Sequence, residues 1–265
     1  MDQTLETYRW LNRAVNGRAD TIADRIYENY DSDAKLSKRK AATLRLRKQR
    51  RRRLVRKYFP IRRDARVLDM GCGGDGLLLG VCAELGYNNL TGIDKRPPSS
   101  AAAAIPVNFV VGDFKQILRD MPDESVEVVV AHDVFEHIES QADCFAVGEQ
   151  IYRILSVSGR LILRTPNCGT PRGMMAQFVD WTHYQFFSAH SLKQLLDLCG
   201  FEDVESFEEA PDWRDGVVHA MRFALWNLLI RSTHQGRLWV EKGYLDQDAI
   251  CSMNFITLAH KRGGR

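Results

Sequence analysis

A short apolar segment followed at once by a glycine-rich turn constrains this chain most. Arg66–Met70 has the character of a short buried strand, and the turn that follows reads GCGGDG up to Gly76. Leu77–Leu85 then has the composition of a buried helix. This order makes a nucleotide-type site at the carboxyl end of a sheet, because glycines let the backbone approach a ligand that faces the helix N–H groups. A tight structural turn needs the same glycines, so the turn alone leaves both interpretations open.

Beyond Pro60, short apolar runs alternate with helical patterns. Four valines occupy five positions from Val126 to Val130, and Gly200 follows the apolar stripe of a helix that begins at Ser188. The alternation predicts an α/β fold, a mostly parallel sheet with helices on both faces. After the strand before the glycine turn, six more are expected at 88–94, 107–113, 126–134, 160–167, 201–209 and 253–261.

Residues 1–60 predict a helical extension, and residues 61–265 predict one domain. Apolar positions have helical spacing over Leu5–Val15 and Ala19–Tyr30. Lys35–Phe59 is rich in helix-forming residues and ends at Pro60. One stripe of this last helix combines Leu44, Arg51, Leu54, Val55 and Tyr58.

Positive charge is concentrated in the same helix. Between Lys35 and Arg66 the sequence has 16 Lys or Arg and one acid, Asp64, a net charge of +15, whereas the whole chain carries +3. The remainder is therefore near −12 by difference. Two interpretations stay open: the helix binds nucleic acid, an anionic membrane or a phosphorylated substrate, or its basic face meets the acidic body of its own protein.

The segment from Trp213 to Asp246 interrupts the alternation before the last strand. Its central part, GVVHAMRFALWNLLIR, is apolar on nearly every side but shorter than the roughly 20 residues of a membrane span. We expect a helical insertion that is buried as a lid over the site. Contact with a membrane or with a second subunit is the alternative.

Cysteine spacing and the first residues indicate a compartment. The six cysteines are scattered, without a CxxC pair or zinc-ribbon spacing, so reduced thiols are expected. The opening residues MDQTLETYRW are acidic and lack the apolar core of a signal peptide. These features predict a cytoplasmic protein, free or peripheral to a membrane.

An acid follows the glycine turn at the distance expected of a ribose-binding residue. Asp94 ends the second predicted strand, about 20 residues after the glycines. The turn reads GxGGxG, a partial match to the GxGxxG of dinucleotide-binding oxidoreductases. The turn therefore gives only weak support to a hydride-transferring enzyme.

At these residues the chain resembles a known family. VLDMGCGGDG is similar to motif I of class I S-adenosylmethionine-dependent methyltransferases, and the resemblance continues through GIDKR, VVGDF, DVFEHI, LSVSGRLILRTPN and DWTHYQFFSAHSLKQLLDLCGF. It covers Arg62–Phe207, with Asn254–Lys261 as the final strand. Asp75 stands where the family's third glycine is usual. The resemblance implies a Rossmann-like methyltransferase fold with a seven-stranded sheet, and S-adenosylmethionine as the cofactor.

The resemblance also implies roles for individual residues. Asp94 is expected at the ribose, Asp113 at the adenine amino group and His132 beside the methionine part. The expected cofactor-binding residues are Asp69, Gly71, Cys72, Gly73, Asp94, Lys95, Asp113, Phe114 and His132.

Acidic and imidazole side chains follow the predicted strand at 126–134. Asp133, Glu136 and His137 are spaced i, i+3 and i+4, so one helical turn brings them to one side, and His183 follows a later strand at the same edge. Two carboxylates and two imidazoles predict a site for a divalent cation, where oxygen-rich ligation favours Mg or Mn and imidazole allows Zn or Fe. The pattern is similar to the ExxEH and distal His of small-RNA 3′-terminal 2′-O-methyltransferases and ubiquinone-pathway O-methyltransferases, with Asp133 in place of the first Glu.

Two other interpretations of these residues stay open. Without a cation, His137 or His183 is the expected catalytic base, since the ordinary pKa of histidine suits proton transfer near neutral pH. Alternatively, Glu136 and His137 are the acid at a helix start and its partner, and His183 is a separate hydrogen-bonding residue.

Resemblance also bears on the acceptor. The TPN segment and the later DxxH are similar to those of bacterial methyltransferases of saccharide, lipid-linked and quinone pathways. This implies O-methylation of a hydroxyl on a small molecule, glycan or lipid-linked acceptor. RNA 2′-O-methylation through the basic helix ranks second, because no aromatic stacking residues lie among its arginines. A cofactor-binding scaffold without catalysis is the third hypothesis.

Overall fold

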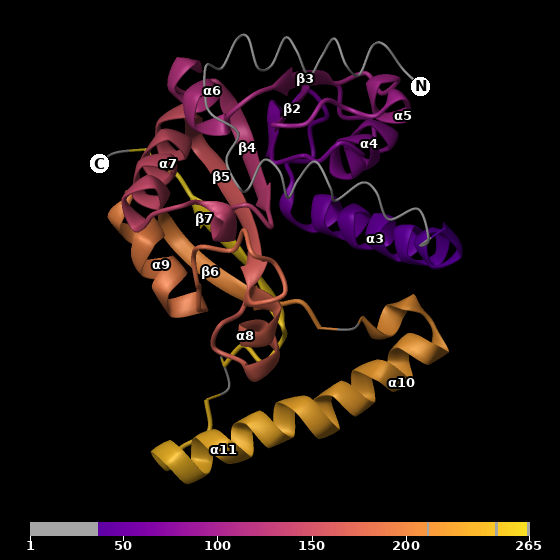
Figure 1. Ribbon diagram of the computed structural model, residues 1–265, viewed down its shortest axis with the longest axis vertical. Helices are drawn as coiled ribbons and strands as arrows, with labels where there is room; N and C mark the ends of the chain where they lie inside the picture. Colours follow the sequence, from indigo (N-terminus) through magenta and orange to yellow (C-terminus); the bar gives the residue numbers. More distant parts are fainter. Residues whose placement is uncertain (1–36, 211, 247–248, 264–265) are drawn as a thin grey trace.

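One seven-stranded sheet organises the protein (Figure 1). The computed structural model describes residues 37–210, 212–246 and 249–263. The strand order is β3-β2-β1-β4-β5-β7-β6, and β7 runs antiparallel to both neighbours while the other pairs are parallel. The predicted mostly parallel sheet is therefore confirmed. The strands are β1 (Val67–Met70), β2 (Leu90–Asp94), β3 (Asn108–Val111), β4 (Val126–His132), β5 (Leu155–Pro166), β6 (Glu202–Glu208) and β7 (Asn254–His260).

Helices cover both faces of the sheet (Figure 1). Along β4, Val128 and Val130 belong to a core with α3 and α4, whereas Val129 and Ala131 belong to a core with α6, α7 and α9. Successive side chains of a strand point to opposite faces, so a strand buried on both sides needs an unbroken apolar run. Along the body the helices are α3 (Ser37–Tyr58), α4 (Leu77–Glu84), α5 (Ser100–Ala103), α6 (Phe114–Asp120), the short η3 (Phe135–His137), α7 (Gln141–Ile154), α8 (Pro171–Gln177) and α9 (Ala189–Leu198).

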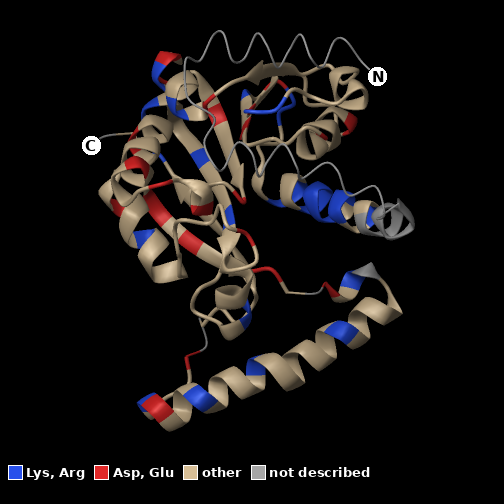
Figure 2. Cartoon of the chain, viewed as in Figure 1, with Lys and Arg blue, Asp and Glu red and all other residues tan. Residues whose placement is uncertain are grey.

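Helix α3 confirms the helix predicted over Lys35–Phe59. The Leu54 and Tyr58 end of its apolar stripe is buried, whereas Leu44 is 46% exposed. Basic residues are concentrated along α3 (Figure 2) and pair with acids of the body: Arg47 with Asp75, Lys48 and Arg52 with Glu84, Arg50 with Glu209, and Arg53 with Asp212. This arrangement agrees with the interpretation in which the basic face meets the acidic body. The two helices expected at Leu5–Val15 and Ala19–Tyr30 lie outside the described residues.

Local signals set the ends of helix α9. The Ser188 hydroxyl accepts a hydrogen bond from the Ser191 amide at 3.2 Å, and the Ser191 hydroxyl accepts one from the Ser188 amide at 3.0 Å. Gly200 follows the helix with φ +95°, a conformation that glycine adopts without strain. The predicted start and stop of this helix are therefore both confirmed.

The insertion before the last strand forms an arm, which consists of α10 (Val217–Leu225), the π-helical turn η5 (Trp226–Arg231) and α11 (Ser232–Lys242), preceded by the short η4 (Trp213–Asp215). The arm runs as one long helix along one end of the molecule, beyond α8 (Figure 1). Every residue of α10, η5 and α11 is at least partly exposed. The expectation of a buried lid is therefore wrong. A segment that is apolar on nearly all sides has no periodicity that selects a buried face.

Two further observations bear on the sequence-based expectations. All six cysteines have free thiols, and five of them are buried. Within the described part of the chain, no helix combines the length and the apolar character needed to cross a membrane.

Candidate functional site

The glycine turn joins β1 to α4 at the carboxyl edge of the sheet. Gly71, Gly73 and Gly76 have left-handed backbone conformations, with φ of +71°, +69° and +52°. A Cβ atom on Gly71 would lie 2.5 Å from a methyl group of Val134, so only glycine fits there. The glycines of the turn therefore present bare backbone to a ligand at the carboxyl edge of the sheet.

Two carboxylates stabilise the turn by accepting hydrogen bonds from backbone amides. Asp94, at the end of β2, accepts hydrogen bonds from the amides of Gly73 (2.8 Å) and Arg96 (2.9 Å). Asp75 accepts one from the amide of Leu77 at 3.3 Å, so it is directed toward the start of α4. Asp75, which stands where the family usually has its third glycine, thus stabilises the helix start, and Asp94 lies beside the turn.

Two polar side chains are buried beneath the turn, and a third is partly buried beside them. Asp69 lies in β1, His132 ends the adjacent strand β4, and Arg51 reaches them from α3, where its Nη1 donates to Nδ1 of His132. Burial raises the pKa of Asp69 to about 7, although the charge of Arg51 opposes the shift. Burial also lowers the pKa of His132 well below its ordinary value, with Arg51 and Arg164 adding to the effect. His132 is therefore neutral near pH 7.

These features fit the residues that the resemblance assigns to the cofactor. Since Nδ1 of His132 accepts from Arg51, its Nε2 carries the proton, and this buried Nε2 has no hydrogen-bond partner among the described residues. Asp113 caps α6 by accepting from the Lys115 amide at 2.9 Å, and Asp94 ends the strand β2. A buried donor, a bare backbone turn and two carboxylates at neighbouring strand ends suit a ligand with amino, carboxyl and ribose groups.

The remaining expected cofactor residues differ in what they can offer. Phe114 is partly buried at the start of α6 and packs against the core. Cys72 has its side chain buried in the core with Leu79, so only its backbone can face a ligand. Lys95 is exposed.

Three potential metal ligands converge beside this region. One ligand atom each from Glu136, His137 and His183 lies within 4.8 Å of the others, and the two imidazole rings are 4.6 Å apart. Glu136 Oε2 accepts from the Thr165 hydroxyl at 3.1 Å, while Glu136 Oε1 and His183 Nδ1 are buried without a hydrogen-bond partner among the described residues. Burial raises the pKa of Glu136. Buried polar atoms without partners are rare in folded proteins, so this cluster is incomplete without a ligand.

A loop brings His183 to the other two residues. The backbone oxygen of Glu136 accepts hydrogen bonds from the amides of Tyr184 (2.7 Å) and Gln185 (3.0 Å). These bonds hold the segment after α8 against η3, and sequence spacing does not predict them. The structure thus joins Glu136 and His137 to a residue more than 40 positions away in the chain.

His137 is oriented by a chain of hydrogen bonds. Its Nδ1 lies 3.1 Å from the carbonyl oxygen of Thr182 and 2.9 Å from its hydroxyl, which donates to Asp180 at 2.7 Å. Burial and the neighbouring His183 lower the pKa of His137. A neutral ring that donates through Nδ1 carries its lone pair on Nε2, the state required of a metal ligand or a base.

Asp133 does not join this cluster, which corrects the four-residue prediction. It precedes η3 with a left-handed backbone, φ +55°, so it shares no helical turn with Glu136 and His137. Both its carboxylate oxygens accept from Arg164 Nη1 instead. Burial lowers the pKa of Arg164, but Asp133 and Glu209 outweigh this effect and leave it above its ordinary value. Asp133 therefore neutralises a buried guanidinium.

Three further residues of the site, Arg51, Arg164 and Thr182, were not expected there from the sequence. Only Arg51 had a usable signal, because it shares the helical stripe of Leu54 and Tyr58. Arg164 lies within an apolar strand, and Thr182 precedes His183 without a spacing that indicates its role.

Known proteins match the chain both in sequence and in structure. The sequence profile of a methyltransferase domain matches residues 43–206. The fold is similar to an S-adenosylmethionine-dependent methyltransferase from Archaeoglobus fulgidus (TM-score 0.58, 23% identity, 81% of this chain and 94% of that chain). It is also similar to a possible histamine N-methyltransferase from Thermotoga maritima (0.57, 15%, 90% and 99%).

A third similar structure contains the methyl donor. It is phosphoethanolamine N-methyltransferase 2 of Haemonchus contortus in complex with S-adenosylmethionine (TM-score 0.53, 16% identity, 81% of this chain and 53% of that chain). No curated protein sequence matches the chain. The methyltransferase profile, however, spans more than half of the chain. The chain therefore belongs to the methyltransferase domain family and is a class I S-adenosylmethionine-dependent methyltransferase.

Proposed function

We propose that the protein methylates a hydroxyl oxygen of a small molecule, glycan or lipid-linked acceptor, with a divalent cation held by Glu136, His137 and His183. The observation that carries the proposal is the pair of buried atoms without hydrogen-bond partners, Glu136 Oε1 and His183 Nδ1, in a cluster whose ligand atoms lie within 4.8 Å of one another. A structural role alone would leave both atoms unsatisfied.

The donor set favours one cation over another. With Asp133 paired to Arg164, the cluster has two imidazoles and one carboxylate. Mg²⁺ prefers oxygen ligands, whereas Mn²⁺ accepts imidazole as well. We therefore propose Mn²⁺ ahead of Mg²⁺ for this site.

The residues of the chain divide the chemistry between them. When bound, S-adenosylmethionine supplies an electrophilic methyl group, and a cation lowers the pKa of a hydroxyl that coordinates to it. Asp94, Asp113 and His132 would hold the methyl donor, and the cluster would orient the acceptor hydroxyl. The Thr182 contact keeps His137 in the tautomer that can ligate or accept a proton at Nε2. Positioning of the two reactants would supply most of the rate gain.

The surface next to His183 supports an acceptor with an apolar part. Phe178, Val179 and Trp181 are 73–83% exposed, and they immediately precede Thr182 and His183. Exposed apolar clusters of this kind are typical of sites that bind apolar ligands.

Nitrogen and RNA acceptors rank lower. Two similar structures are named as N-methyltransferases, but an amine has no need of a cation to attack a methyl group at neutral pH. For RNA, the basic residues of α3 pair with acids of the same chain, which reduces the charge left for phosphates.

Metal depletion tests the proposal. The purified chain, treated with chelator and desalted, is assayed for transfer of labelled methyl groups to panels of hydroxyl and amine acceptors. We expect hydroxyl transfer to be lost and Mn²⁺ to restore it. Glu136→Gln should remove the response to Mn²⁺, whereas Glu139→Gln, an exposed acid near the same segment, should retain it. Full activity after rigorous chelation, or transfer to amines alone, would contradict the proposal.

A further inference from the structure

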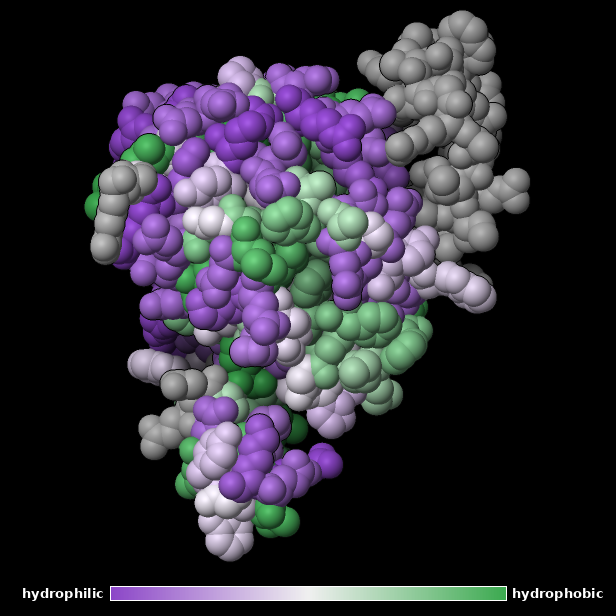
Figure 3. Space-filling model, turned by 90° about the vertical axis from the view of Figure 1, so that its left-hand side faces the viewer, coloured by the Kyte–Doolittle hydropathy of each residue, from purple (hydrophilic) through white to green (hydrophobic). Residues whose placement is uncertain are grey.

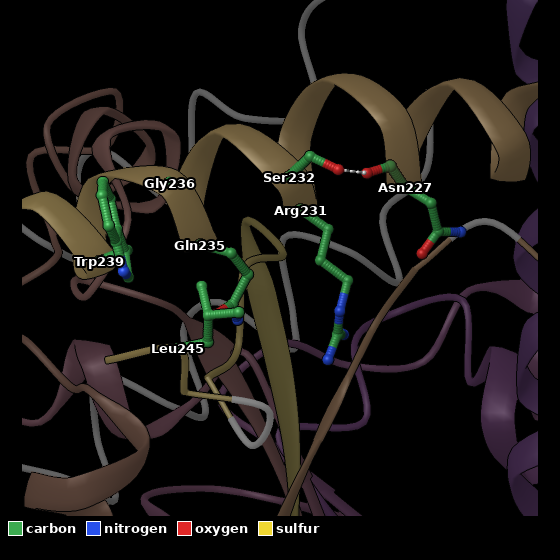
Figure 4. A pocket seen from close by; sticks show the side chains of 7 residues that line it. All are labelled: Asn227, Arg231, Ser232, Gln235, Gly236, Trp239 and Leu245. Atoms are coloured by element: carbon green, nitrogen blue, oxygen red, sulfur yellow. Dashed lines mark hydrogen bonds between the residues drawn. The ribbon is translucent and has the colours of Figure 1, made fainter. Parts of the chain in front are cut away.

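The arm has two unlike sides. The side that faces the body carries Arg231, which pairs with Glu208 at 3.2 Å, and Gln235, whose Oε1 accepts from the Asp246 amide at 3.0 Å. Between these contacts lies a pocket of about 660 Å³ (Figure 4), lined by Asn227, Arg231, Ser232, Gln235, Gly236, Trp239 and Leu245. The Arg231–Glu208 ion pair therefore links the arm to β6 of the body, whereas the Gln235 contact reaches only the segment that follows α11.

The other side is the outer face, defined as Val217, Val218, Met221, Leu225, Leu228, Leu229 and Val240. These side chains are 51–79% exposed, whereas Phe223, Trp226 and Leu238 on the opposite side are partly buried. Most members recur at spacings of three or four residues, so they form one stripe. The stripe covers α10 and η5, and Val240 is its one member on α11; an exposed apolar stripe of this kind marks a surface that meets a protein or a membrane. Hydrophobic residues also reach the surface of the body in the middle of Figure 3, below a hydrophilic upper third.

Charge indicates what covers the outer face. Between Val217 and Val240 the sequence has three arginines, Arg222, Arg231 and Arg237, and neither Asp nor Glu. Arg222 and Arg237 are exposed, and so is Trp213, which precedes the arm, whereas Trp239 lines the pocket on the side that faces the body. An apolar helical face with basic residues at its borders suits the boundary between lipid headgroups and acyl chains.

A second copy of the chain fits this face less well. If two outer faces packed antiparallel about their midpoint, Arg222 of one copy would approach Arg237 of the other. Parallel packing would place each arginine beside its own counterpart. Both arrangements bring like charges together within an apolar contact, which is unfavourable.

We propose that the outer face of the arm docks on a membrane surface rich in anionic lipids and lies in the plane of the interface. The apolar side chains enter the headgroup boundary, and Arg222 and Arg237 contact lipid phosphates. This inference goes beyond the proposed function, since it concerns the arm and holds for any acceptor.

Vesicle flotation of the full chain tests the docking. We expect binding to phosphatidylcholine vesicles that contain phosphatidylglycerol, weak binding without it, and a decrease as salt rises. The double substitution Leu225→Gln with Leu228→Gln should abolish flotation. The control Leu198→Gln changes an exposed leucine on α9 and should leave flotation unchanged. Arg222→Gln with Arg237→Gln should remove the preference for phosphatidylglycerol.

Several outcomes would overturn the inference. These are absent flotation of the native chain with anionic vesicles, or equal flotation of the Leu225→Gln, Leu228→Gln variant. A native dimer that this variant converts to monomer, without vesicle binding, would assign the face to a second copy. Calorimetric Mn²⁺ binding, measured on the same proteins, reports separately on the proposed function, and the arm variants should leave it unchanged.

Discussion

Glu136 contributes to the candidate site through both its backbone and its side chain. Its carbonyl oxygen holds the loop that carries His183, and its carboxylate oxygen Oε2 accepts from Thr165. The loop contact does not depend on the side chain, so a Gln at this position retains the loop and removes only the charge. The two histidines would then remain together even where cation binding is lost.

Asp94 connects the glycine turn to the second strand, and Asp94→Ala tests its expected role at the cofactor. The change removes acceptors of the Gly73 and Arg96 amides and a candidate ribose contact. Hydrogen bonds to a charged group contribute about 1.5–3 kcal/mol, so S-adenosylmethionine affinity should fall roughly 10-fold to 100-fold. Calorimetry measures it, with the exposed Asp120→Ala as control. Unchanged affinity in Asp94→Ala would remove the ribose assignment.

Asp69 makes the stability of the fold depend on pH. Its pKa is raised from 3.8 to about 7 by burial, so the folded state binds this proton more tightly than the unfolded state. The contribution of Asp69 to the free energy of unfolding is therefore greatest below pH 3.8 and is lost as the pH rises to about 7, a change of up to about 4 kcal/mol.

Urea denaturation at a series of pH values measures this effect. The difference in the free energy of unfolding between the native chain and Asp69→Asn should decrease from pH 3.8 to about pH 7 and become constant at higher pH. Parallel stability curves for the two proteins would show that Asp69 keeps an ordinary pKa. Asp120→Asn, at an exposed position, should follow the native curve throughout.

Sequence reasoning at this scale succeeded where chemistry and spacing are local. Glu136 and His137 are neighbours, and Asp94 follows the glycines at the expected distance. Asp133 could not be assigned in this way, because its partner Arg164 is on another strand and its left-handed backbone depends on that context. The position of His183 likewise depends on backbone hydrogen bonds to Glu136 that no motif encodes.

Helix α3 shows how one element can be both basic and part of the core. The run of four arginines would suggest a solvated helix, yet the same segment buries Leu54, Val55 and Tyr58. Helical periodicity allows both, since charged side chains extend from the borders of an apolar stripe. The stripe was readable from the sequence, whereas the acids that meet each arginine come from elements distant in the chain.

Substitutions at the two ends of the apolar stripe of α3 should differ in their effect on stability. Leu54→Ala removes a buried side chain and should lower the free energy of unfolding by about 2–5 kcal/mol, because it leaves a cavity against the sheet. Leu44→Ala, at the exposed end of the same stripe, should change it by no more than about 0.5 kcal/mol. Thermal or urea denaturation measures both. Equal effects would mean that α3 is not docked through this stripe.

The arm illustrates the limit of pattern analysis for single elements. Its helical character was predicted, but its place was not, because apolar residues occur all around it. The π-helical turn at Trp226–Arg231 shifts the phase of the helix, so that Phe223 and Leu238 lie on the same inner side and Leu225 and Val240 share the outer face. No feature of the local sequence indicates this shift.

For the whole molecule, the alternation of strands and helices predicted the architecture, but the order of strands came from the structure. The last strand, β7, enters between β5 and β6 and runs antiparallel to both. Strand patterns indicate burial and length, whereas neighbours depend on the path of the connections. The carboxyl edge nevertheless gathers the predicted residues of β1, β2 and β4, since parallel strands end on the same side.

The place of β7 also has a consequence for biosynthesis. Strand β6 has β7 as its sheet neighbour, and the arm is translated between them. A nascent chain folds from its N-terminal side, so β5 and β6 both await a partner while the apolar arm leaves the ribosome. Unpaired strand edges beside exposed apolar surface are prone to aggregate. We therefore expect a ribosomal pause between the arm and β7 to lower the yield of folded enzyme, and a chaperone bound there to raise it.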